Sequence, residues 1–369
     1  MIKKIDFLKK IREFIYKNRK KRILKDQIIR NRDFYFLNKS NFNPIIVPKE
    51  ENGWEAWQTF NPAAIVLEDK VHFLYRAIGF DGVSRLGYAR SDDGFKIRER
   101  LDYPVFEHQS KIFFNYHSFF SGGSFYGAED PRIVRVDNED CLYLTYTACD
   151  GGLGVGLSSI KVNDFLSKRW RWRKPQIISP PNEIHKNWVI FPEKINGYYA
   201  ILHSISPRIL ITFRDSLEFK EGDYIKSYYS GRNWKNASWE FYVRGVGPPP
   251  IKTRLGWLIF YHAVEKFDWW KYKVGLMILD IKNPEKMIYK TKEPVLQPDK
   301  EYENNGFKPG IIYVSAVVIK NGKILVYYGA ADSYVGVAYA NFDQFLKQIE
   351  KDNKPEFLIT SLKKKHNDS

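Results

Sequence analysis

The sequence predicts an all-β fold, a five-bladed β-propeller with an N-terminal basic amphipathic helix. One pattern of paired apolar runs recurs five times along the chain. Helical spacing of apolar residues is confined to residues 1–30 and about 341–352, so an α/β fold lacks the helices it would need between strands. Of the 369 residues, 44% are hydrophobic and 16% aromatic, a composition that can fill a large packed core.

Each repeat consists of an apolar run, a polar turn and a second apolar run that ends near a tyrosine or histidine. Asn196-Gly197 and Asn321-Gly322 fall at two of the turns and are strong hairpin signals. A weaker strand pair follows each hairpin, and four strands in each of five repeats predict the propeller. Two β-sandwich domains are the alternative, but they do not explain a pattern that recurs five times. The repeats begin at Asn61, Asp130, Asn187, Val246 and Val314.

The chain divides into a basic N-terminal helical extension (1–40), the propeller (41–350) and a polar C-terminal tail (351–369). The formal net charge is +16, and residues 1–30 hold 12 Lys/Arg against three Asp/Glu. This helix is interpreted as a solvated element, or alternatively as a peripheral contact with an anionic membrane or polymer. It contains no run suited to a signal peptide or membrane span.

The absence of recognisable motifs and the small number of cysteines indicate which partners and which compartment to expect. No nucleic-acid reader motif accompanies the basic charge, so nucleic acid is not an expected partner. The two cysteines, Cys141 and Cys149, show neither metal-ligand spacing nor a disulfide framework, which favours a cytoplasmic location. No metal site is expected.

Aligning the repeats brings polar residues into register. The start of the first strand and the end of the second are neighbours in a hairpin, so both positions should face the propeller axis. A third polar position follows about three residues later. The first position holds Asn61, Asp130 and Asn187; the second holds Arg76, Thr147, Ser204, His262 and Gly329; the third holds Asp150, Glu265 and Asp332. Together with Lys186, such a ring predicts a binding site at the channel mouth.

The segment "GAEDPRIV", residues 127–134, places two carboxylates at the start of a strand. A residue before proline is biased toward extended geometry, which would fix the direction of Asp130. Alternation along the strand puts Asp130 and Arg132 on one side and Glu129 on the other. We therefore expect Asp130 on the axis, a structural Glu129 that points away, and a structural salt bridge for Arg132.

Five ordered motifs resemble those of glycoside hydrolase family 130, the β-mannoside phosphorylases and β-1,2-mannosidases. They are "GAEDPRI", "HKNWVIFPEKINGYY", "GPPPIKTRLGWLIFYHAV", "PVLQPDKEYENNGF" and "ILVYYGAADSYVGVA", and the resemblance covers roughly residues 55–345. It implies a five-bladed propeller whose axial site cleaves a β-mannoside oligosaccharide or glycan with inversion. It implies no cofactor, and inorganic phosphate as co-substrate if the enzyme is a phosphorylase.

The resemblance also implies roles for individual residues. When phosphate attacks the sugar, only one protein carboxylate is essential. That acid would be Asp130, with its proton passing through the 3-hydroxyl of the mannosyl unit. Sugar-binding positions match Asn61, Arg76, Asp332, Tyr261, Glu303 and Trp188, and phosphate-binding positions match Lys186, Asn187 and His262.

One departure from the family's motifs weakens the prediction that the enzyme is a phosphorylase. Family phosphorylases carry an arginine where "ILHSISP" has Ser204, and the nearby Arg208 need not replace it. The alternative is a β-1,2-mannosidase that uses water, with Glu265 or Glu240 as the base. A non-catalytic glycan-binding propeller is the third hypothesis. In "KTRLGW", Lys252 and Arg254 replace a commonly acidic residue, which suggests an acidic acceptor.

Overall fold

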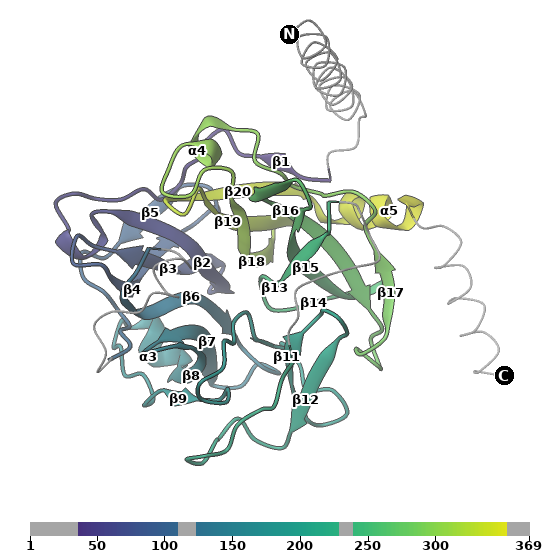
Figure 1. The fold of residues 1–369 in the computed structure, drawn as a ribbon, viewed down its shortest axis with the longest axis horizontal. Coiled ribbons are helices and arrows are strands. Elements are labelled where there is room, and N and C mark those ends of the chain that lie inside the picture. The colour runs from purple at the N-terminus through teal and green to yellow at the C-terminus, as the bar shows by residue number, and fades with distance from the viewer. Residues whose placement is uncertain (1–35, 110–122, 229–238, 353–369) are drawn as a thin grey trace, which may run out of the picture. The chain divides into compact units, whose positions relative to one another are not determined.

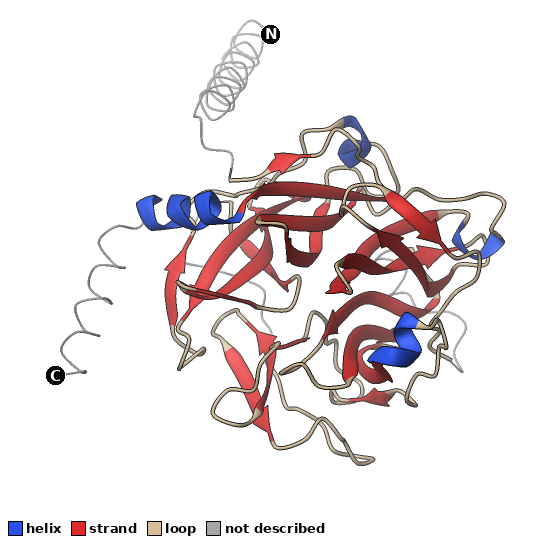
Figure 2. Cartoon of the chain, turned by 180° about the vertical axis from the view of Figure 1, so that it is seen from behind, coloured by secondary structure: helices blue, strands red, loops and turns tan. Residues whose placement is uncertain are grey.

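A computed structural model describes residues 36–109, 123–228 and 239–352 of the chain (Figure 1). These residues are mostly β-strand, which confirms the all-β prediction. Figure 2 shows strands through the body of the structure and short helices at its margins. The predicted basic helix at 1–30 and nearly all of the predicted tail lie outside the described residues. No helix in the described ranges is long and apolar enough to cross a membrane.

The first two repeats form two antiparallel groups of four strands. The first group runs β2 (Gln58–Leu67), β3 (Lys70–Ile78), β4 (Val83–Ser91) and β5 (Ile97–Arg100), preceded by the 3₁₀ turn η1 (Gly53–Glu55). The second runs β6 (Tyr126–Val134), β7 (Cys141–Cys149), β8 (Leu153–Lys161) and β9 (Gln176–Ile177), with the short helix α3 (Val162–Leu166) after β8. A short parallel pairing of β4 with β6 links the two groups.

The third and fourth repeats are less regular. The third group has three strands, β10 (Val189–Ile190), β11 (Tyr199–Ser204) and β12 (Leu210–Arg214), and no fourth strand within the described residues. The fourth group has β13 (Tyr242–Val246), β14 (Ile251–Thr253), β15 (Gly256–Glu265), β16 (Asp268–Leu279) and β17 (Met287–Lys290). Both β13 and β14 pair with β15, so the Pro248–Pro250 run divides what would otherwise be one continuous strand beside β15.

The fifth group takes one strand from the other end of the chain. It contains β18 (Ile312–Lys320), β19 (Lys323–Ala330), β20 (Tyr334–Asn341) and β1 (Asn38–Lys39). Residues 38–39 therefore belong to this sheet and not to the N-terminal extension. Helix α4 (Glu301–Asn304) precedes β18, and α5 (Phe342–Asp352) is the helix expected near 341–352. Helix α5 buries Phe345, Leu346 and Ile349.

The two hairpin turns and the alignment of the repeats are confirmed. Asn196 and Gly197 both have positive φ, as do Asn321 and Gly322, as a type I′ turn requires. Arg76 pairs with Phe60, Thr147 with Glu129 and His262 with Gly245, so the two predicted polar positions are neighbours. In Figure 1, β2, β6, β13 and β18 surround the middle of the body, whereas β5, β9 and β17 lie toward its margin.

A bulge recurs in β2, β6, β13 and β18, which are called the inner strands below. At Asp130 it gives a backbone conformation other than the extended one that was predicted. The pairing shifts between Phe60 and Ala63, Glu129 and Arg132, Val243 and Gly245, and Val314 and Ala316. Asp130 has φ +47°, which is left-handed rather than extended. The bulge overrides the preference of a residue before proline, and simple alternation fails across residues 129–132.

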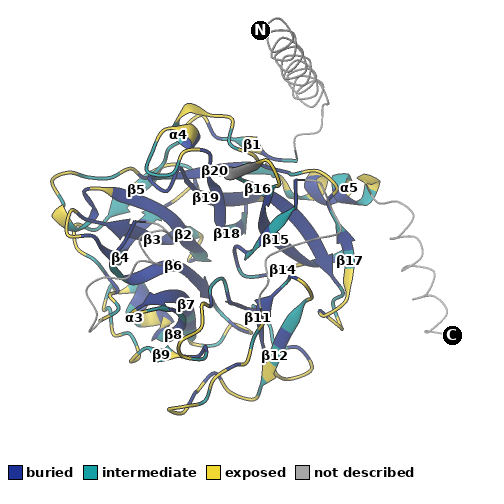
Figure 3. Cartoon of the chain, in the orientation of Figure 1, coloured by how far each residue is buried: buried dark blue, intermediate teal, exposed yellow. Residues whose placement is uncertain are grey.

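A second repeated feature lies in the core, where a tyrosine ring covers a cross-strand glycine. The hydroxyls of three of these tyrosines, Tyr75, Tyr261 and Tyr328, donate to buried glutamates. A Cβ on the facing glycine would come within 2.3–2.6 Å of the ring in each of the four pairs, so only glycine fits. The pairs are Tyr75–Gly87, Tyr146–Gly156, Tyr261–Gly275 and Tyr328–Gly336. Figure 3 shows the inner strands as predominantly buried.

Candidate active site

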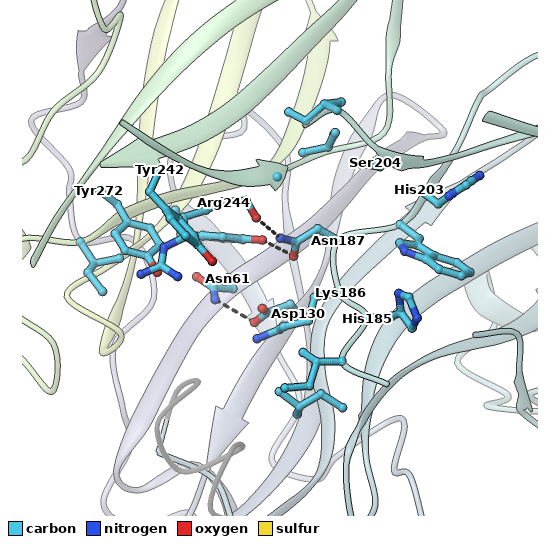
Figure 4. Close-up of a pocket in the computed structure, with 18 of the residues that line it drawn as sticks. Asn61, Asp130, His185, Lys186, Asn187, His203, Ser204, Tyr242, Arg244 and Tyr272 are labelled. Carbon is cyan, nitrogen blue, oxygen red and sulfur yellow. Dashed lines mark hydrogen bonds between the residues drawn. The ribbon is translucent and has the colours of Figure 1, made fainter. Parts of the chain in front are cut away.

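A cavity of about 370 Å³ opens where the inner strands meet. Asn61 comes from β2, Asp130 from β6, Arg244 from β13 and Tyr313 from β18, with Asn187 just before β10. All five repeats thus contribute to one pocket. Figure 4 shows Asn61 and Asp130 directed toward each other, with Lys186 beside them.

Asp130 is anchored by two donors. Its Oδ1 accepts hydrogen bonds from Asn61 Nδ2 at 2.8 Å and from Arg76 Nη1 at 3.1 Å. Arg76 is fully buried and also donates to Glu129 Oε1 at 2.9 Å. Glu129 therefore shares Arg76 with Asp130, because the bulge brings the two side chains to the same guanidinium, but it does not line the cavity, in keeping with the expected structural role. It is buried, and Lys186 Nζ lies 3.7 Å from its Oε2.

The two pocket carboxylates are pushed in opposite directions. Burial disfavours the charge on Asp130, but Arg76, Lys186 and Arg132, with the hydrogen bond from Asn61, outweigh it and hold the pKa of Asp130 below its usual range. Burial raises the pKa of Asp332, aided by the charge on Asp130 and opposed by Lys308 and Arg76. Lys308 Nζ lies 3.3 Å from Asp332 Oδ2. Asp130 is thus the carboxylate that is ionised most readily.

Within the described residues the hydrogen bonds of Arg132 go to neutral groups, and no side-chain salt bridge of the predicted kind is formed. It donates to the carbonyls of Asp130 and Gly247, to Asn187 Oδ1 and to the Tyr313 hydroxyl. Asn187 also accepts from Tyr313 and donates to the carbonyl of Arg244 at 2.9 Å. Arg132 therefore fixes the backbone at Asp130 and joins it to the third and fourth groups.

His262 lies beneath the pocket instead of lining it. Its ring is fully buried and stacks on Tyr313 with centroids 4.0 Å apart. Burial, together with the charge of Arg132, lowers the pKa of His262 to about 3, so the imidazole is neutral at physiological pH. Among the three predicted phosphate residues, Lys186 and Asn187 reach the cavity wall.

Several other predicted residues do not line the pocket. Tyr261 donates to Glu240 Oε1 at 2.6 Å, and Glu240 also pairs with Lys290. Glu303 is fully buried, bound by Lys39 Nζ at 2.6 Å and the Tyr328 hydroxyl at 2.9 Å. These contacts make Tyr261, Glu240 and Glu303 part of the repeated tyrosine–glutamate packing.

The other base candidate and the predicted aromatic platform are also accounted for. Glu265 pairs with Lys273 at 3.0 Å and is not part of the cavity wall. Asp150 is exposed and lies outside the lining, whereas Asp332 is inside it. Trp188 lines the cavity with only 1% of its surface exposed, packed between His185 and His203. Its indole therefore packs behind the cavity wall and does not present an open ring face on which a sugar could stack.

Sequence reasoning missed Arg244, Lys308, Tyr242 and Tyr272, all of which line the cavity. Arg244 stands in "YVRGVGPPP", just ahead of the segment from which the fourth repeat was counted. The inner strand β13 begins earlier, at Tyr242. A search for polar residues before the glycine–proline run could have found Arg244.

Comparison with known proteins identifies the family. Residues 19–351 match the model of glycoside hydrolase family 130, described as beta-1,4-mannooligosaccharide phosphorylase. A 1,2-beta-oligomannan phosphorylase of Thermoanaerobacter sp. (strain X514) is 35% identical over 316 residues, which cover 82% of this chain and 96% of the relative. A beta-1,2-mannobiose phosphorylase of the same organism is 32% identical over 315 residues, again 82% and 96%.

Solved structures agree on the fold. The beta-1,2-mannobiose phosphorylase of Listeria innocua, in complex with beta-1,2-mannobiose, superposes with a TM-score of 0.66 at 22% identity, covering 85% of this chain and 99% of that one. A structure from a study of family 130 glycoside hydrolases that target beta-1,2 mannosidic linkages in Candida mannan has a TM-score of 0.67 at 23% identity, covering 84% and 95%. The chain belongs to glycoside hydrolase family 130 and is an enzyme of that family.

Proposed function

We propose that this protein is a β-mannoside phosphorylase, which cleaves β-1,2-linked mannosides with inversion to give mannose 1-phosphate. The five sheet groups would be the blades of a five-bladed propeller, with the pocket at its axis. Two relatives above 30% identity bear phosphorylase names and act on β-1,2 linkages according to those names. The linkage and the product are assigned to this chain on that support.

The observation that carries the proposal is the anchored carboxylate of Asp130, which faces a pocket lined by basic side chains. Asp130 is held by Asn61 and Arg76, and Lys186 stands beside it. Inverting cleavage needs a proton for the leaving oxygen and an attacking group on the opposite face of the sugar. Phosphate as the attacking group removes the need for a second carboxylate that acts as a base.

The ionised state of Asp130 is compatible with its role as the acid. Its pKa is lowered mainly by the positive charges of Arg76 and Lys186. A bound phosphate would offset part of that charge, and a bound sugar would exclude water, so both changes raise the proton affinity of Asp130. Binding of both substrates would therefore favour the protonated form of Asp130, which is the form that donates the proton.

Hydrolysis is the second candidate, and Ser204 is the observation that favours it. Its hydroxyl donates to the Ser206 carbonyl at 3.1 Å, so it serves a local turn where the family's phosphorylases have arginine. Neither Glu265 nor Glu240 lines the pocket, and Asp332 is the remaining carboxylate that could assist water.

One experiment separates the two reactions. The full-length protein is incubated with β-1,2-mannobiose, with and without inorganic phosphate, and mannose and mannose 1-phosphate are quantified. We expect mannose 1-phosphate only when phosphate is present, with the α configuration by NMR because the reaction inverts. Mannose released at the same rate without phosphate would establish hydrolysis instead. β-1,4-Mannobiose in parallel tests the linkage.

A further inference from the structure

Glu129 is a buried carboxylate beside the candidate acid that does not line the cavity. It is fully buried on β6 and directly precedes Asp130. A charge in such a place is costly unless cations and hydrogen-bond donors compensate for it. The glutamates of the tyrosine–glutamate packing bond to tyrosine hydroxyls in the core, whereas Glu129 bonds to a cation of the site. Its surroundings therefore connect it to the chemistry at Asp130.

Both carboxylate oxygens of Glu129 face cations that also face Asp130. Oε1 accepts hydrogen bonds from Arg76 Nη2 at 2.9 Å and from Ser124 Oγ at 2.6 Å, and Oε2 lies 3.7 Å from Lys186 Nζ. Arg76 Nη1 donates to Asp130 Oδ1 at 3.1 Å, and Lys186 lies beside Asp130 (Figure 4). The two adjacent carboxylates thus share the same two cations.

Glu129 helps to fix the direction of the Arg76 guanidinium. Nε of Arg76 donates to Ser84 Oγ at 3.1 Å, and its central carbon lies 4.6 Å from the ring centroid of Phe60. With Nη2 bound to Glu129, the planar fork leaves Nη1 directed at Asp130. Any change at Glu129 is therefore transmitted to Asp130 through one rigid group.

The charge of Glu129 also opposes the positive field at Asp130. Burial disfavours the charge on Asp130, but Arg76 and Lys186 outweigh it and lower its pKa. An acid must hold its proton before it can protonate the leaving oxygen. A second carboxylate between the same two cations raises the proton affinity of Asp130. The other charged or titratable groups that face Asp130 are Arg132 of β6, Asp332 after β19 with its partner Lys308, and the neutral His262 of β15.

We propose that Glu129 is a positioning residue for the acid, which acts through Arg76 and Lys186 to orient Asp130 and to keep its carboxyl able to take up a proton. Glu129 itself touches neither the sugar nor the attacking group. The inference rests on the proposed role of Asp130 as the acid, and it holds whether phosphate or water attacks. A purely structural Glu129 would fix Arg76 without any effect of its charge, and the pH dependence of turnover separates the two roles.

The test compares kcat of the wild type and Glu129→Gln on β-1,2-mannobiose with phosphate, between about pH 5 and pH 9. Turnover falls at high pH as the acid loses its proton in the enzyme–substrate complex. Without the charge of Glu129, we expect this fall at least about one pH unit lower, which is about a 10-fold lower rate above it. Ionisation of phosphate is common to both proteins, so the difference between the two profiles belongs to the enzyme.

Two further variants separate charge from packing. Glu129→Asp keeps the charge and should keep the position of the high-pH fall near that of the wild type, whatever its rate. Glu240→Gln is the matched control, because Glu240 is equally buried and bound by a cation but lies outside the cavity lining. It should leave the profile unmoved. A Glu129→Gln enzyme that is slower by the same factor at every pH would show a structural role and overturn the inference.

A double variant keeps the test decisive if Glu129→Gln does not fold. Removing both members of a buried ion pair is tolerated better than removing one. In Glu129→Gln with Lys186→Gln, one charge of each sign is lost, so the high-pH fall should lie within about half a pH unit of the wild type and about one unit below that of Lys186→Gln alone.

The outcomes separate this inference from the proposed function. The same profile in Lys186→Gln and in the double variant would overturn the inference alone. So would an unmoved profile in Glu129→Gln, provided that Asp130→Asn has lost its activity. A wild-type rate in Asp130→Asn would overturn the proposed function as well, because Asp130 would then not be the acid.

Discussion

Two buried carboxylate clusters in this protein look alike and differ in what they face. Asp130 is bound by Asn61 and Arg76, and Glu240 is bound by Tyr261 and Lys290. Their exposed fractions are nearly equal, 4% for Asp130 and 3% for Glu240. Asp130 lines the cavity, whereas Glu240 is enclosed by protein, with Trp239 stacked on Tyr261. Burial and a cationic partner therefore do not identify the functional carboxylate; access to the cavity does.

The number of copies of each cluster adds to the contrast. The glutamate–tyrosine–cation arrangement occurs in three groups, as Glu55–Tyr75–Arg100, Glu240–Tyr261–Lys290 and Glu303–Tyr328–Lys39. Among the residues that the structure describes, the Asp130 cluster occurs once, although Asn61 and Asn187 occupy the same position in other repeats. The glutamate–tyrosine–cation cluster recurs from repeat to repeat and therefore serves to pack the sheets. The Asp130 cluster is found in one repeat and belongs to the candidate active site.

Replacing Asp130 should have the largest effect. Asp130→Asn keeps the shape and an acceptor oxygen for Arg76 but removes the proton donor. General acid catalysis contributes about 10²–10⁴-fold, so we expect phosphorolysis to fall by at least about 100-fold. Initial rates of mannose 1-phosphate formation at saturating substrates measure this. A rate within a few-fold of the wild type, in a folded variant, would remove Asp130 from the chemistry.

The equivalent change at Glu240 should affect stability and spare the reaction. Glu240→Gln weakens the bonds to Tyr261 and Lys290 in a buried site, and a hydrogen bond to a charged group is worth about 1.5–3 kcal/mol. We expect a loss of that order in the free energy of unfolding, measured by urea titration. The turnover number should stay near that of the wild type. A catalytic defect as large as that of Asp130→Asn would restore Glu240 as a base candidate.

The sequence predicted the scaffold better than the wall of the site. The repeat pattern located the strands, both Asn-Gly turns and the neighbours Asp130, Asn61 and Arg76, because pairing depends on local periodicity. It did not predict that a bulge brings Glu129 to the same guanidinium as Asp130, and it missed Arg244, which precedes the segment from which the fourth repeat was counted. It also could not separate Tyr261 and Glu303 from sugar ligands, since motif position does not reveal whether a side chain faces the cavity or the packed core.

His262 extends the comparison to pH. The unfolded chain takes up a proton near the ordinary histidine pKa of about 6.5, whereas the folded protein takes it up only near 3. The stability contributed by the neutral ring is therefore present above pH 6.5 and is lost as the pH falls below it. Between pH 7 and pH 5, this one residue should account for a loss of about 2 kcal/mol.

The measurement is the slope of unfolding free energy against pH for the wild type and His262→Gln. We expect a shallower slope in the variant between pH 7 and pH 5, whatever its absolute stability. His72 and His203 are buried, with pKa values lowered to about 4, and keep their share of the slope in both proteins. Identical slopes would mean that His262 is accessible to protons in the folded state, as a phosphate ligand at the cavity surface would be.

The smallest effect is expected where the same chemistry lies in water. Arg254 pairs with Glu350 of α5, and both side chains are substantially exposed, 47% and 36%. Neither Arg254 nor Lys252, which pairs with Glu193, lines the pocket, so the structure gives no support to the acidic-acceptor interpretation of these two cations. Exposed ion pairs contribute about 0–1 kcal/mol, so Arg254→Gln should lower the free energy of unfolding by less than about 1 kcal/mol. Even that difference in unfolding free energy should shrink in 1 M salt, because the screening length there is about 3 Å. A changed KM for the mannoside in Arg254→Gln would show instead that this surface contacts the substrate.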